Sequence, residues 1–343
     1  MEYDVVIVGA GPAGSSAAWF LSGSGLRVAV IERLSDEKFP EYHRICGGGI
    51  SRRGASLIPL KEEEILNSVD SIRLRWPGNT VTDIRVKGYV IDRPKLSRRL
   101  LEESGAQSIH GSVTDVWLLG DICSITLADG RVIRSRYVIG ADGAFSAVRK
   151  GVFRTRPEIF TPMEEHISED PTEDVFEFGI GQEFGGAYRW LFPCGSGRTV
   201  GSVSGMVVPD IRERGLHRFI PSGCVPEPVK GNVFLIGDAA GFPNPLTYGG
   251  LRTAFESARK ATEAIRKGDP SIYAKWQKHS RLFDRRFMEL HNAMCVMKDD
   301  DLRDFSKAMT HRNLFVNGLC SVIRRPRYAK AYIGCLMAIL YGW

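Results

Sequence analysis

The beginning of the chain alternates between the periodicities of strands and helices. Tyr3 to Val8 is rich in β-branched residues and predicts a buried parallel strand. Ser15 to Leu21 continues as a helix, and Arg27 to Ile31 predicts a second strand that ends at Glu32. A strand, a helix and a second strand in this order indicate an α/β fold with a parallel sheet.

The turn between the first strand and the helix reads Gly9-Ala10-Gly11-Pro12-Ala13-Gly14. This spacing, in this context, indicates a cradle for the pyrophosphate of a dinucleotide. Gly9 permits the tight turn, Gly11 leaves room for the phosphates, and Gly14 lets the helix pack close to the strand. Glu32 lies 18 residues after Gly14, near the spacing of a carboxylate that binds ribose hydroxyls. The motif by itself fits NAD and FAD equally.

Two later strands also end in turns of small residues. Arg136 to Gly143 is a strand that ends in Ala-Asp-Gly, and Gly231 to Gly241 contains a strand that ends in Gly-Asp. A long helical pattern from Leu251 to Lys267 comes later, directly after Gly249-Gly250. We expect both turns and the start of this helix to face the same dinucleotide.

The remaining pattern predicts a second sheet and a helical end. Ile72 to Val90 and Val175 to Val207 read as strand-rich, whereas the chain after Ser271 looks helical. Val113 to Ile133 predicts a small β-meander whose hairpin turn is Ala128-Asp129-Gly130. We expect a dinucleotide-binding domain from 1–70, 92–150 and 225–270, a substrate domain from 71–91 and 151–224, and a helical C-terminal region from 271–343.

Composition and charge narrow the class of protein without changing this picture. The chain has 343 residues, 46 basic against 40 acidic, and a net charge of +6. Hydrophobic residues make up 43% of it, which is ordinary for a soluble globular protein and excludes a disordered, collagen-like or coiled-coil chain. The charge excess is small and no recognition motif is present, so we expect no nucleic acid partner.

The cysteines and the first residues bear on the compartment. The seven cysteines contain no Cys-x-x-Cys pair, so we expect neither a disulfide framework nor a zinc or iron–sulfur site, and no metal. The leader Met1-Glu2-Tyr3-Asp4 is acidic, unlike that of a secretory signal. No apolar stretch has the ~18–20 residues of a membrane span. We therefore expect a reduced, cytoplasmic protein.

Two further segments bear on the chemistry. In Arg44-Ile45-Cys46-Gly47-Gly48-Gly49, three glycines follow a cysteine, which suits a backbone pressed against a planar ligand. In Tyr188-Arg189-Trp190-Leu191-Phe192-Pro193, alternation places three aromatic rings on one face of a strand. Such an aromatic wall suits an apolar substrate. A small buried cysteine and an ordinary sheet face over a core are the alternatives.

The three strand-and-turn motifs, in this order, resemble the flavoprotein fold of p-hydroxybenzoate hydroxylase and its reductase relatives. The Arg-x-Cys-Gly-Gly-Gly and Tyr-x-Trp-x-Phe-Pro segments further resemble the geranylgeranyl reductase family. The resemblance implies an FAD-binding Rossmann-like domain, a discontinuous β-sheet substrate domain and a helical C-terminus. It also implies an enzyme that uses FAD to saturate C=C bonds of geranylgeranyl-type isoprenoid chains in lipid biosynthesis.

The resemblance further implies roles for single residues. Asp238 would accept a hydrogen bond from the ribityl chain, and Arg93 would approach the cofactor; a turn residue and a surface charge are the alternatives. Cys46 would lie beside the flavin ring, where a thiol can assist proton delivery. The residues expected at the cofactor are Gly9, Gly11, Ala13, Gly14, Glu32, Arg44, Cys46, Gly47, Gly49, Arg93, Val113, Asp142, Asp238, Gly249, Gly250 and Leu251. The residues expected at the substrate are Tyr188, Trp190, Phe192, Pro193 and Tyr248.

The expected partners are an apolar isoprenoid or lipid substrate and an electron donor, either NAD(P)H or a protein such as ferredoxin. Basic residues just before the apolar stretch from Ala331 to Trp343 fit peripheral contact with an anionic membrane, the alternative being a tail packed on the body. Two other functions stay open at this point. One is an FAD-dependent monooxygenase or halogenase on the same fold, and the other is a non-catalytic flavin electron-transfer protein.

Overall fold

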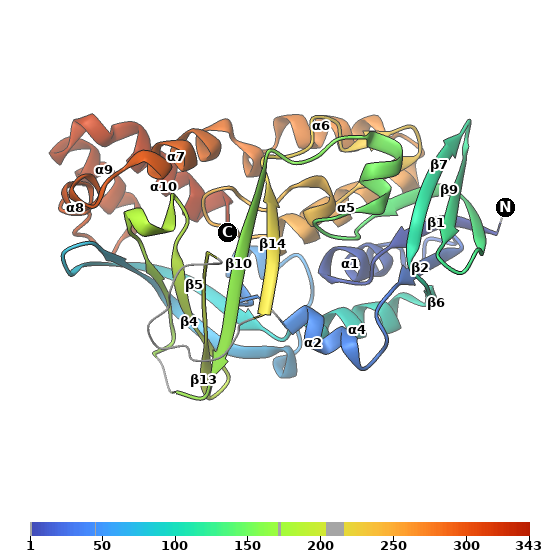
Figure 1. Ribbon diagram of the computed structural model, residues 1–343, viewed down its shortest axis with the longest axis horizontal. Helices are drawn as coiled ribbons and strands as arrows, with labels where there is room; N and C mark the ends of the chain where they lie inside the picture. The colour runs from blue at the N-terminus through green and yellow to red at the C-terminus, as the bar shows by residue number, and fades with distance from the viewer. Residues whose placement is uncertain (1, 45, 171–172, 204–215) are drawn as a thin grey trace.

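The computed structural model describes residues 2–44, 46–170, 173–203 and 216–343. Figure 1 shows an elongated molecule, with one sheet toward the N-terminus and a second sheet below the C-terminal helices. The strand-rich segment expected to end at Val207 can be followed only to Val203, because Val207 lies outside the described residues.

The first sheet is built on parallel strands around β1. Its order is β15-β16-β9-β1-β2-β6, and the β7-β8 hairpin joins it through β9. Its strands are β1 (Tyr3–Val8), β2 (Val28–Glu32), β6 (Gln107–His110), β7 (Val113–Leu119), β8 (Ile122–Leu127), β9 (Val132–Gly140), β15 (Val229–Lys230) and β16 (Val233–Leu235). β1 is parallel to β2 and to β9. Val5 to Val8 are buried, as expected of a central parallel strand covered on both faces.

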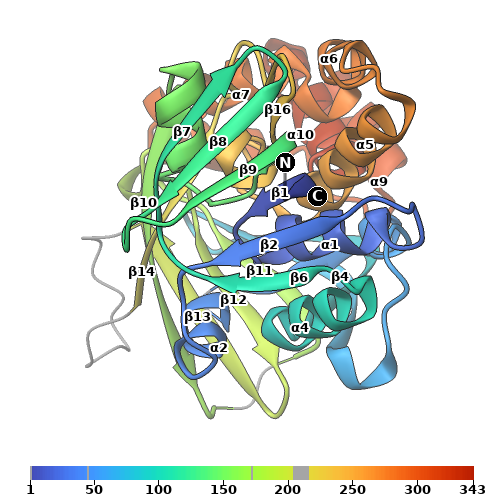
Figure 2. The same ribbon diagram turned by 90° about the vertical axis from the view of Figure 1, so that its right-hand side faces the viewer.

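A group of helices packs beside this sheet. α1 (Pro12–Leu21) lies between α4 (Arg93–Ser104) and α5 (Leu251–Lys267), and α6 (Ser271–His279) packs on α5 (Figure 2). Buried alanines of α1 and α5 let the two helices approach closely. The helix predicted from Leu251 to Lys267 is confirmed at both ends.

The meander predicted from Val113 to Ile133 is also confirmed. β7 pairs antiparallel with β8, and β8 pairs antiparallel with β9. The predicted hairpin turn lies between β8 and β9, where Gly130 has a φ of +85°, a conformation that glycine adopts at little cost.

The second sheet has the order β14-β10-β13-β12-β11-β4-β5-β3. Its strands are β3 (Gly49–Ser51), β4 (Ile65–Trp76), β5 (Thr80–Ile91), β10 (Ile159–Ser168), β11 (Val175–Gly179), β12 (Arg189–Cys194), β13 (Gly197–Val203) and β14 (Leu216–Ser222). β11 pairs parallel with β4, and the other pairs are antiparallel. β3 and the start of β4 lie within the range 1–70 that we expected in the first domain, so this sheet begins earlier in the chain than residue 71.

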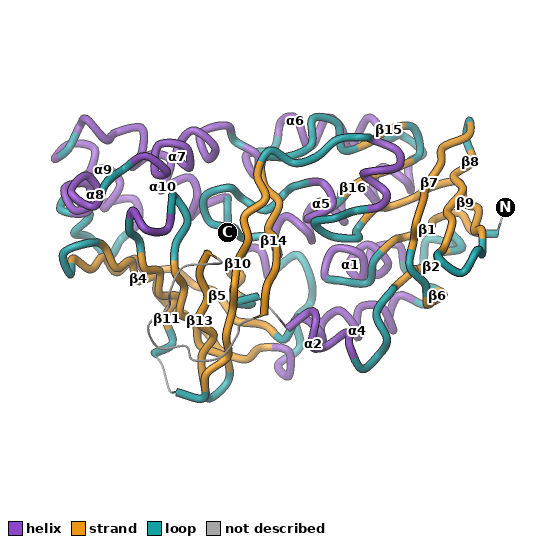
Figure 3. The backbone as a smooth tube through the Cα atoms, in the orientation of Figure 1, coloured by secondary structure: helices purple, strands orange, loops and turns teal. Residues whose placement is uncertain are grey.

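The C-terminal region is helical, as expected, and folds over the second sheet (Figure 3). Its helices are α7 (Arg285–Val296), α8 (Asp299–Ser306), α9 (Leu314–Arg324) and α10 (Ala329–Tyr341). α10 packs against α7 and α9. Tyr332 and Ala338 of α10 are buried, so the apolar tail packs on the body, which is the second of the two alternatives considered for it.

Short helices and turns complete the chain. They are α2 (Lys38–Arg44), α3 (Arg52–Ala55), 3-10 turns at Glu62–Glu64, Gln182–Phe184, Gly237–Ala240, Arg281–Phe283 and Pro326–Tyr328, and a π-helical turn at Arg149–Phe153. Within the described ranges, no helix combines the length and apolarity needed to cross a membrane. No group of three or more His, Cys, Asp or Glu residues in the same ranges could hold a metal ion.

Candidate active site

A cavity of about 350 Å³ joins the predicted cofactor motifs to the second sheet and the C-terminal helices. One part of its lining comes from the glycine-rich motifs and the residues beside them, namely Gly11, Pro12, Ala13, Cys46, Gly47, Gly48, Gly49, Arg93, Asp238, Gly249, Gly250 and Leu251. Another part is apolar and comes from the C-terminal helices and their connections, namely Leu290, Met294, Met297, Leu302, Phe305, Met309, Ala331, Cys335, Ala338 and Ile339. Phe178 of β11 and Trp190 and Phe192 of β12 line the same cavity.

The first glycine motif is held in shape by contacts that allow no side chain. Gly9 has a φ of +97°, and a Cβ on Gly14 would lie 1.8 Å from the Gly9 carbonyl oxygen. Glu32 fixes the loop from the other side, since its carboxylate accepts hydrogen bonds from the backbone N–H groups of Ala10 (2.8 Å) and Leu34 (2.9 Å). The carboxylate therefore lies beside the loop that would hold the phosphates.

Near Gly11 the cavity is lined by a histidine and by arginines, which can bind the phosphates of a dinucleotide. The imidazole of His43 covers Gly11, and a Cβ on this glycine would lie 2.9 Å from the ring. Burial, with Arg93, Arg218 and Arg33 adding to it, lowers the pKa of His43 to about 3, so the ring is neutral at neutral pH. Arg93 has a buried Nε with no hydrogen-bond partner. A phosphate-bearing cofactor would supply the missing acceptor, and the site therefore fits FAD.

The two aspartates after the strands have different surroundings. Asp142 accepts hydrogen bonds from the N–H groups of Ala147 (2.7 Å) and Val148 (3.2 Å), and so caps the following turn. Asp238 lines the cavity at the end of the strand β16, near Gly250. Burial raises the pKa of Asp238 to about 6, against the lowering effect of Arg93 and Arg149. Asp238 is thus the aspartate that faces the cavity.

The first turn of α5 also faces the cavity. Gly250 is the N-cap of this helix, and Leu251 and Ala254 line the cavity with it. The first N–H groups of a helix have no partner within the helix, and they carry a partial positive charge. They can therefore stabilise a negative charge on a ring placed against this turn.

Aromatic side chains of the protein itself leave no room for a Cβ at two of the glycines after Cys46. A Cβ on Gly47 would lie 2.5 Å from Phe192, and a Cβ on Gly49 would lie 2.9 Å from Phe176. The planar groups that press on this backbone are therefore these two phenyl rings, in addition to any ligand. Cys46 is exposed and lines the cavity. Arg44, the last residue of α2, is exposed.

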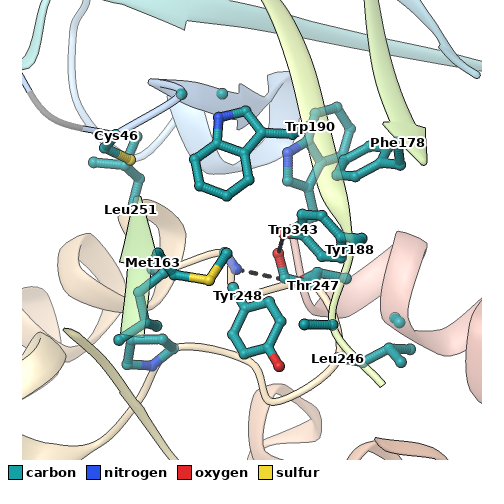
Figure 4. A pocket seen from close by; sticks show the side chains of 18 of the residues that line it. Cys46, Met163, Phe178, Tyr188, Trp190, Leu246, Thr247, Tyr248, Leu251 and Trp343 are labelled. Atoms are coloured by element: carbon teal, nitrogen blue, oxygen red, sulfur yellow. Dashed lines mark hydrogen bonds between the residues drawn. The ribbon is translucent and has the colours of Figure 1, made fainter. Parts of the chain in front are cut away.

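The aromatic residues of the second motif line the cavity together. Figure 4 shows Tyr188, Trp190 and Tyr248 around the same cavity. The ring centroids of Tyr188 and Tyr248 are 5.5 Å apart, and the Tyr188 hydroxyl donates a hydrogen bond to the Thr247 carbonyl oxygen. Phe192 lines the cavity as well. Pro193 is buried in β12 opposite Arg198.

Tyr248 and Val113 were predicted at the site, and the structure gives their backbone conformation and location. Tyr248 has a φ of +50°, which is unusual for a residue with a large side chain, and its ring is buried against the cavity. Val113 begins β7, two residues after Gly111, whose N–H donates to the Glu32 carbonyl oxygen (2.9 Å). Val113 thus lies near the end of β2 and Glu32.

Several residues at the cavity were not expected from the sequence. Phe178 packs against Tyr188 and Phe192, with centroids 4.8 Å and 5.2 Å away. Met163 and Glu165 line the cavity from β10, and both are buried. The alternation along β10 could have indicated them, because residues two apart share one face of a strand. A buried face that carries a glutamate is itself a signal.

The comparisons with known proteins agree with this geometry. The FAD binding domain family matches residues 2–42. The chain is 28% identical to digeranylgeranylglycerophospholipid reductase 2 of Methanopyrus kandleri, with 92% of each protein covered. It is 29% identical to geranylgeranyl diphosphate reductase of Rhodobacter capsulatus, with 79% of this chain and 78% of the relative covered.

Solved structures show the same fold. A geranylgeranyl bacteriochlorophyll reductase-like protein from Thermoplasma acidophilum matches with a TM-score of 0.78 at 20% identity, over 97% of this chain and 99% of the other. A flavin-dependent halogenase matches with a TM-score of 0.70 at 17% identity, over 98% and 76%.

The match to the FAD binding domain, the reductases that align with the chain and the shared fold together define it as an FAD-dependent oxidoreductase with a p-hydroxybenzoate hydroxylase-like architecture. Within this class, the predicted resemblance to the geranylgeranyl reductase family is confirmed by relatives that align along most of the chain.

Proposed function

We propose that the protein saturates isolated C=C bonds of isoprenoid chains, of the geranylgeranyl type, in lipid biosynthesis. The observation that carries this proposal is one cavity. It is lined at one part by the glycines predicted at the flavin and at another part by apolar side chains of the C-terminal helices. A polyprenyl chain has no polar group along its length, so a lining of Leu, Met, Phe and Ala side chains matches its chemistry. The names of the relatives point in the same direction.

The protein's part in the reaction follows from its residues. Reduced FAD supplies the hydride when it is bound. The rings of Tyr188, Trp190 and Tyr248 line the cavity, and their π faces can stabilise positive charge that develops on the alkene carbon. We propose that Asp238 and Arg93 hold the cofactor, because both line the cavity beside its glycine segments. The exposed thiol of Cys46 stays a candidate for gating the flavin side.

The test is a single turnover without oxygen. We expect the photoreduced holoenzyme to be reoxidised by a geranylgeranyl phospholipid, with a gain of two hydrogens for each bond reduced, measured by mass spectrometry and flavin absorbance. A saturated phospholipid is the control and should leave the flavin reduced. No reoxidation by the unsaturated lipid, or rapid NADPH oxidation in air with a hydroxylated product, would reject the proposal.

The source of reducing equivalents belongs to the same proposal. We expect either NAD(P)H or a reduced ferredoxin to reduce the bound flavin, in the cytoplasm and at the surface of the membrane that holds the lipid. Anaerobic reduction of the holoenzyme by each donor in turn separates the two.

We propose that α9 makes the contact with the membrane. Phe315, Leu319 and Ile323 are 62%, 65% and 71% exposed and recur every four residues, so they form one apolar stripe along this helix. Arg324, Arg325 and Arg327 follow the stripe directly. An exposed apolar stripe beside basic residues is typical of surfaces that lie on anionic bilayers.

Replacing Phe315, Leu319 and Ile323 together by serine should abolish flotation with anionic phospholipid vesicles. The loss follows from removing the apolar stripe while the arginines remain. The matched control replaces the exposed Leu119, Ile122 and Val132 of the β7–β9 meander, at the other end of the molecule in Figure 1, and should float like the unmodified protein. Equal flotation of both variants would contradict a role for α9.

A further inference from the structure

Glu165 is a buried carboxyl group that the proposed reaction has not yet used. It is 4% exposed, lies on β10 and lines the cavity. One carboxylate oxygen accepts a hydrogen bond from the Cys46 N–H at 2.8 Å, and the other accepts one from the Trp190 indole N–H at 3.2 Å. Glu165 therefore joins the loop on the flavin side to the aromatic wall on the substrate side.

The sheet is built to bring these groups together. Glu165 on β10 pairs with Gly201 on β13, and Gly201 pairs with Trp190 on β12, so the three residues form one row across three strands. A Cβ on Gly201 would lie 1.8 Å from the Trp190 ring. The glycine thus lets the indole lie flat across β13 and reach the carboxylate. A purely apolar cavity would not need this arrangement.

We infer that Glu165 is the proton donor for the reduction of the alkene. This inference rests on the proposed function. The substrate gains a hydride at one alkene carbon, from reduced FAD, and the carboxyl proton of Glu165 at the other. The C=C π bond breaks, two C–H bonds form, and FAD is left oxidised. The Glu165 carboxylate then regains a proton from solvent, close to Cys46, which is exposed.

The electrostatic surroundings suit this role. Burial raises the pKa of Glu165 to about 7, while the Cys46 N–H, Arg93, the Trp190 N–H and Arg44 lower it in part. Arg218 on β14 and Cys194 on β12 also interact with this carboxyl group. An acid whose pKa lies near the working pH is protonated in a large share of the molecules. It can therefore donate its proton and is reprotonated quickly from solvent.

Glu165→Gln should slow reoxidation of reduced flavin by the geranylgeranyl lipid by roughly 10²-fold or more, as removal of a general acid does. FAD content and reoxidation by oxygen should match the unmodified protein. In the unmodified protein the rate should fall above about pH 7, because the donor must be protonated. Trp190→Phe should move this falling limb to higher pH, since the lost N–H donor stabilised the carboxylate.

A second readout does not depend on turnover. Infrared difference spectra of the oxidised holoenzyme should show a protonated carboxyl band that titrates near pH 7 and is absent from Glu165→Gln. If the unmodified protein shows this band but no alkene reduction, the proposed function fails and the protonated site stands. Glu165 is not the donor if the Glu165→Gln protein reduces the lipid at the rate of the unmodified protein. The same conclusion follows if Trp190→Phe does not shift the pH above which the rate falls.

Discussion

Replacing Gly14 with alanine should leave the protein folded but without its FAD. A Cβ at this position would lie 1.8 Å from the Gly9 carbonyl oxygen and 2.9 Å from the Gly9 carbonyl carbon, both backbone atoms. Either α1 shifts away from β1 or the turn at Gly9 opens. Both movements displace the N–H groups that would hold the phosphates. The helix itself favours alanine over glycine by about 0.5–1 kcal/mol, so global unfolding is not the expected result.

The measurement is the FAD content of the purified protein, followed by titration with FAD. We expect the Gly14→Ala protein to be nearly colourless and to bind FAD at least about tenfold more weakly, which corresponds to 1.4 kcal/mol. Gly318→Ala is the matched control, because it is the same change within a helix and its Cβ would meet Leu336 at an ordinary 3.5 Å. A yellow, stoichiometric Gly14→Ala protein would show that the cradle is not built as described.

Replacing Gly201 with alanine should disable the substrate side while the FAD stays bound. The new Cβ would overlap the Trp190 ring, with its nearest ring atom at 1.8 Å, and the ring fills the space over β13. The indole must leave this position and give up its hydrogen bond to Glu165. Overpacking of this kind costs about 1–3 kcal/mol, so a folded protein is expected.

Three measurements define the Gly201→Ala result. FAD content should be unchanged, the near-ultraviolet circular dichroism of the aromatic wall should change, and anaerobic reoxidation by the lipid should be lost. Gly179→Ala on β11 of the same sheet is the matched control, since its Cβ would meet Arg189 at an ordinary 3.5 Å. Lipid-dependent reoxidation at the normal rate in Gly201→Ala would contradict the role given to the Trp190 position.

The sequence predicted those parts of the fold that depend on neighbouring residues. The β1–α1–β2 unit, the hairpin turn that contains Gly130 and the helix from Leu251 to Lys267 all follow from short-range patterns, and the structure has each of them. Their signals are a glycine at a required turn, a run of β-branched residues, or a helical period. Each of these acts within a few residues.

The sequence could not identify what presses on the glycines after Cys46. The run indicates a flat neighbour, but the rings of Phe176 and Phe192 reach it only after three distant segments have formed one sheet. Asp142 was also predicted at the cofactor; one of its carboxylate oxygens caps the turn that follows it, and the other is buried without a hydrogen-bond partner. A motif gives the position of a residue along the fold, and the direction of its side chain depends on the hydrogen bonds available nearby.

The largest omission was the contribution of β10 and the C-terminal helices to the cavity. Glu165 lies 119 residues from Cys46, to which it is hydrogen-bonded, and 25 residues from Trp190. No local pattern connects residues so far apart. The helical character of residues 271–343 was predicted, but the side of α7 and α10 that faces the cavity depends on how these helices pack on the second sheet.

The attachment of α10 has a consequence for folding. The Ser51 hydroxyl donates to the backbone oxygen of Trp343, and the Thr247 hydroxyl donates to that of Gly342, each at 2.7 Å. Arg252 donates to the backbone oxygens of Leu340 and Tyr341. Contacts between residues this distant in the chain form slowly, because a large loop must close first. During synthesis the apolar cavity therefore stays open to other chains until α10 has emerged, and chaperone dependence and aggregation should be greatest in that interval.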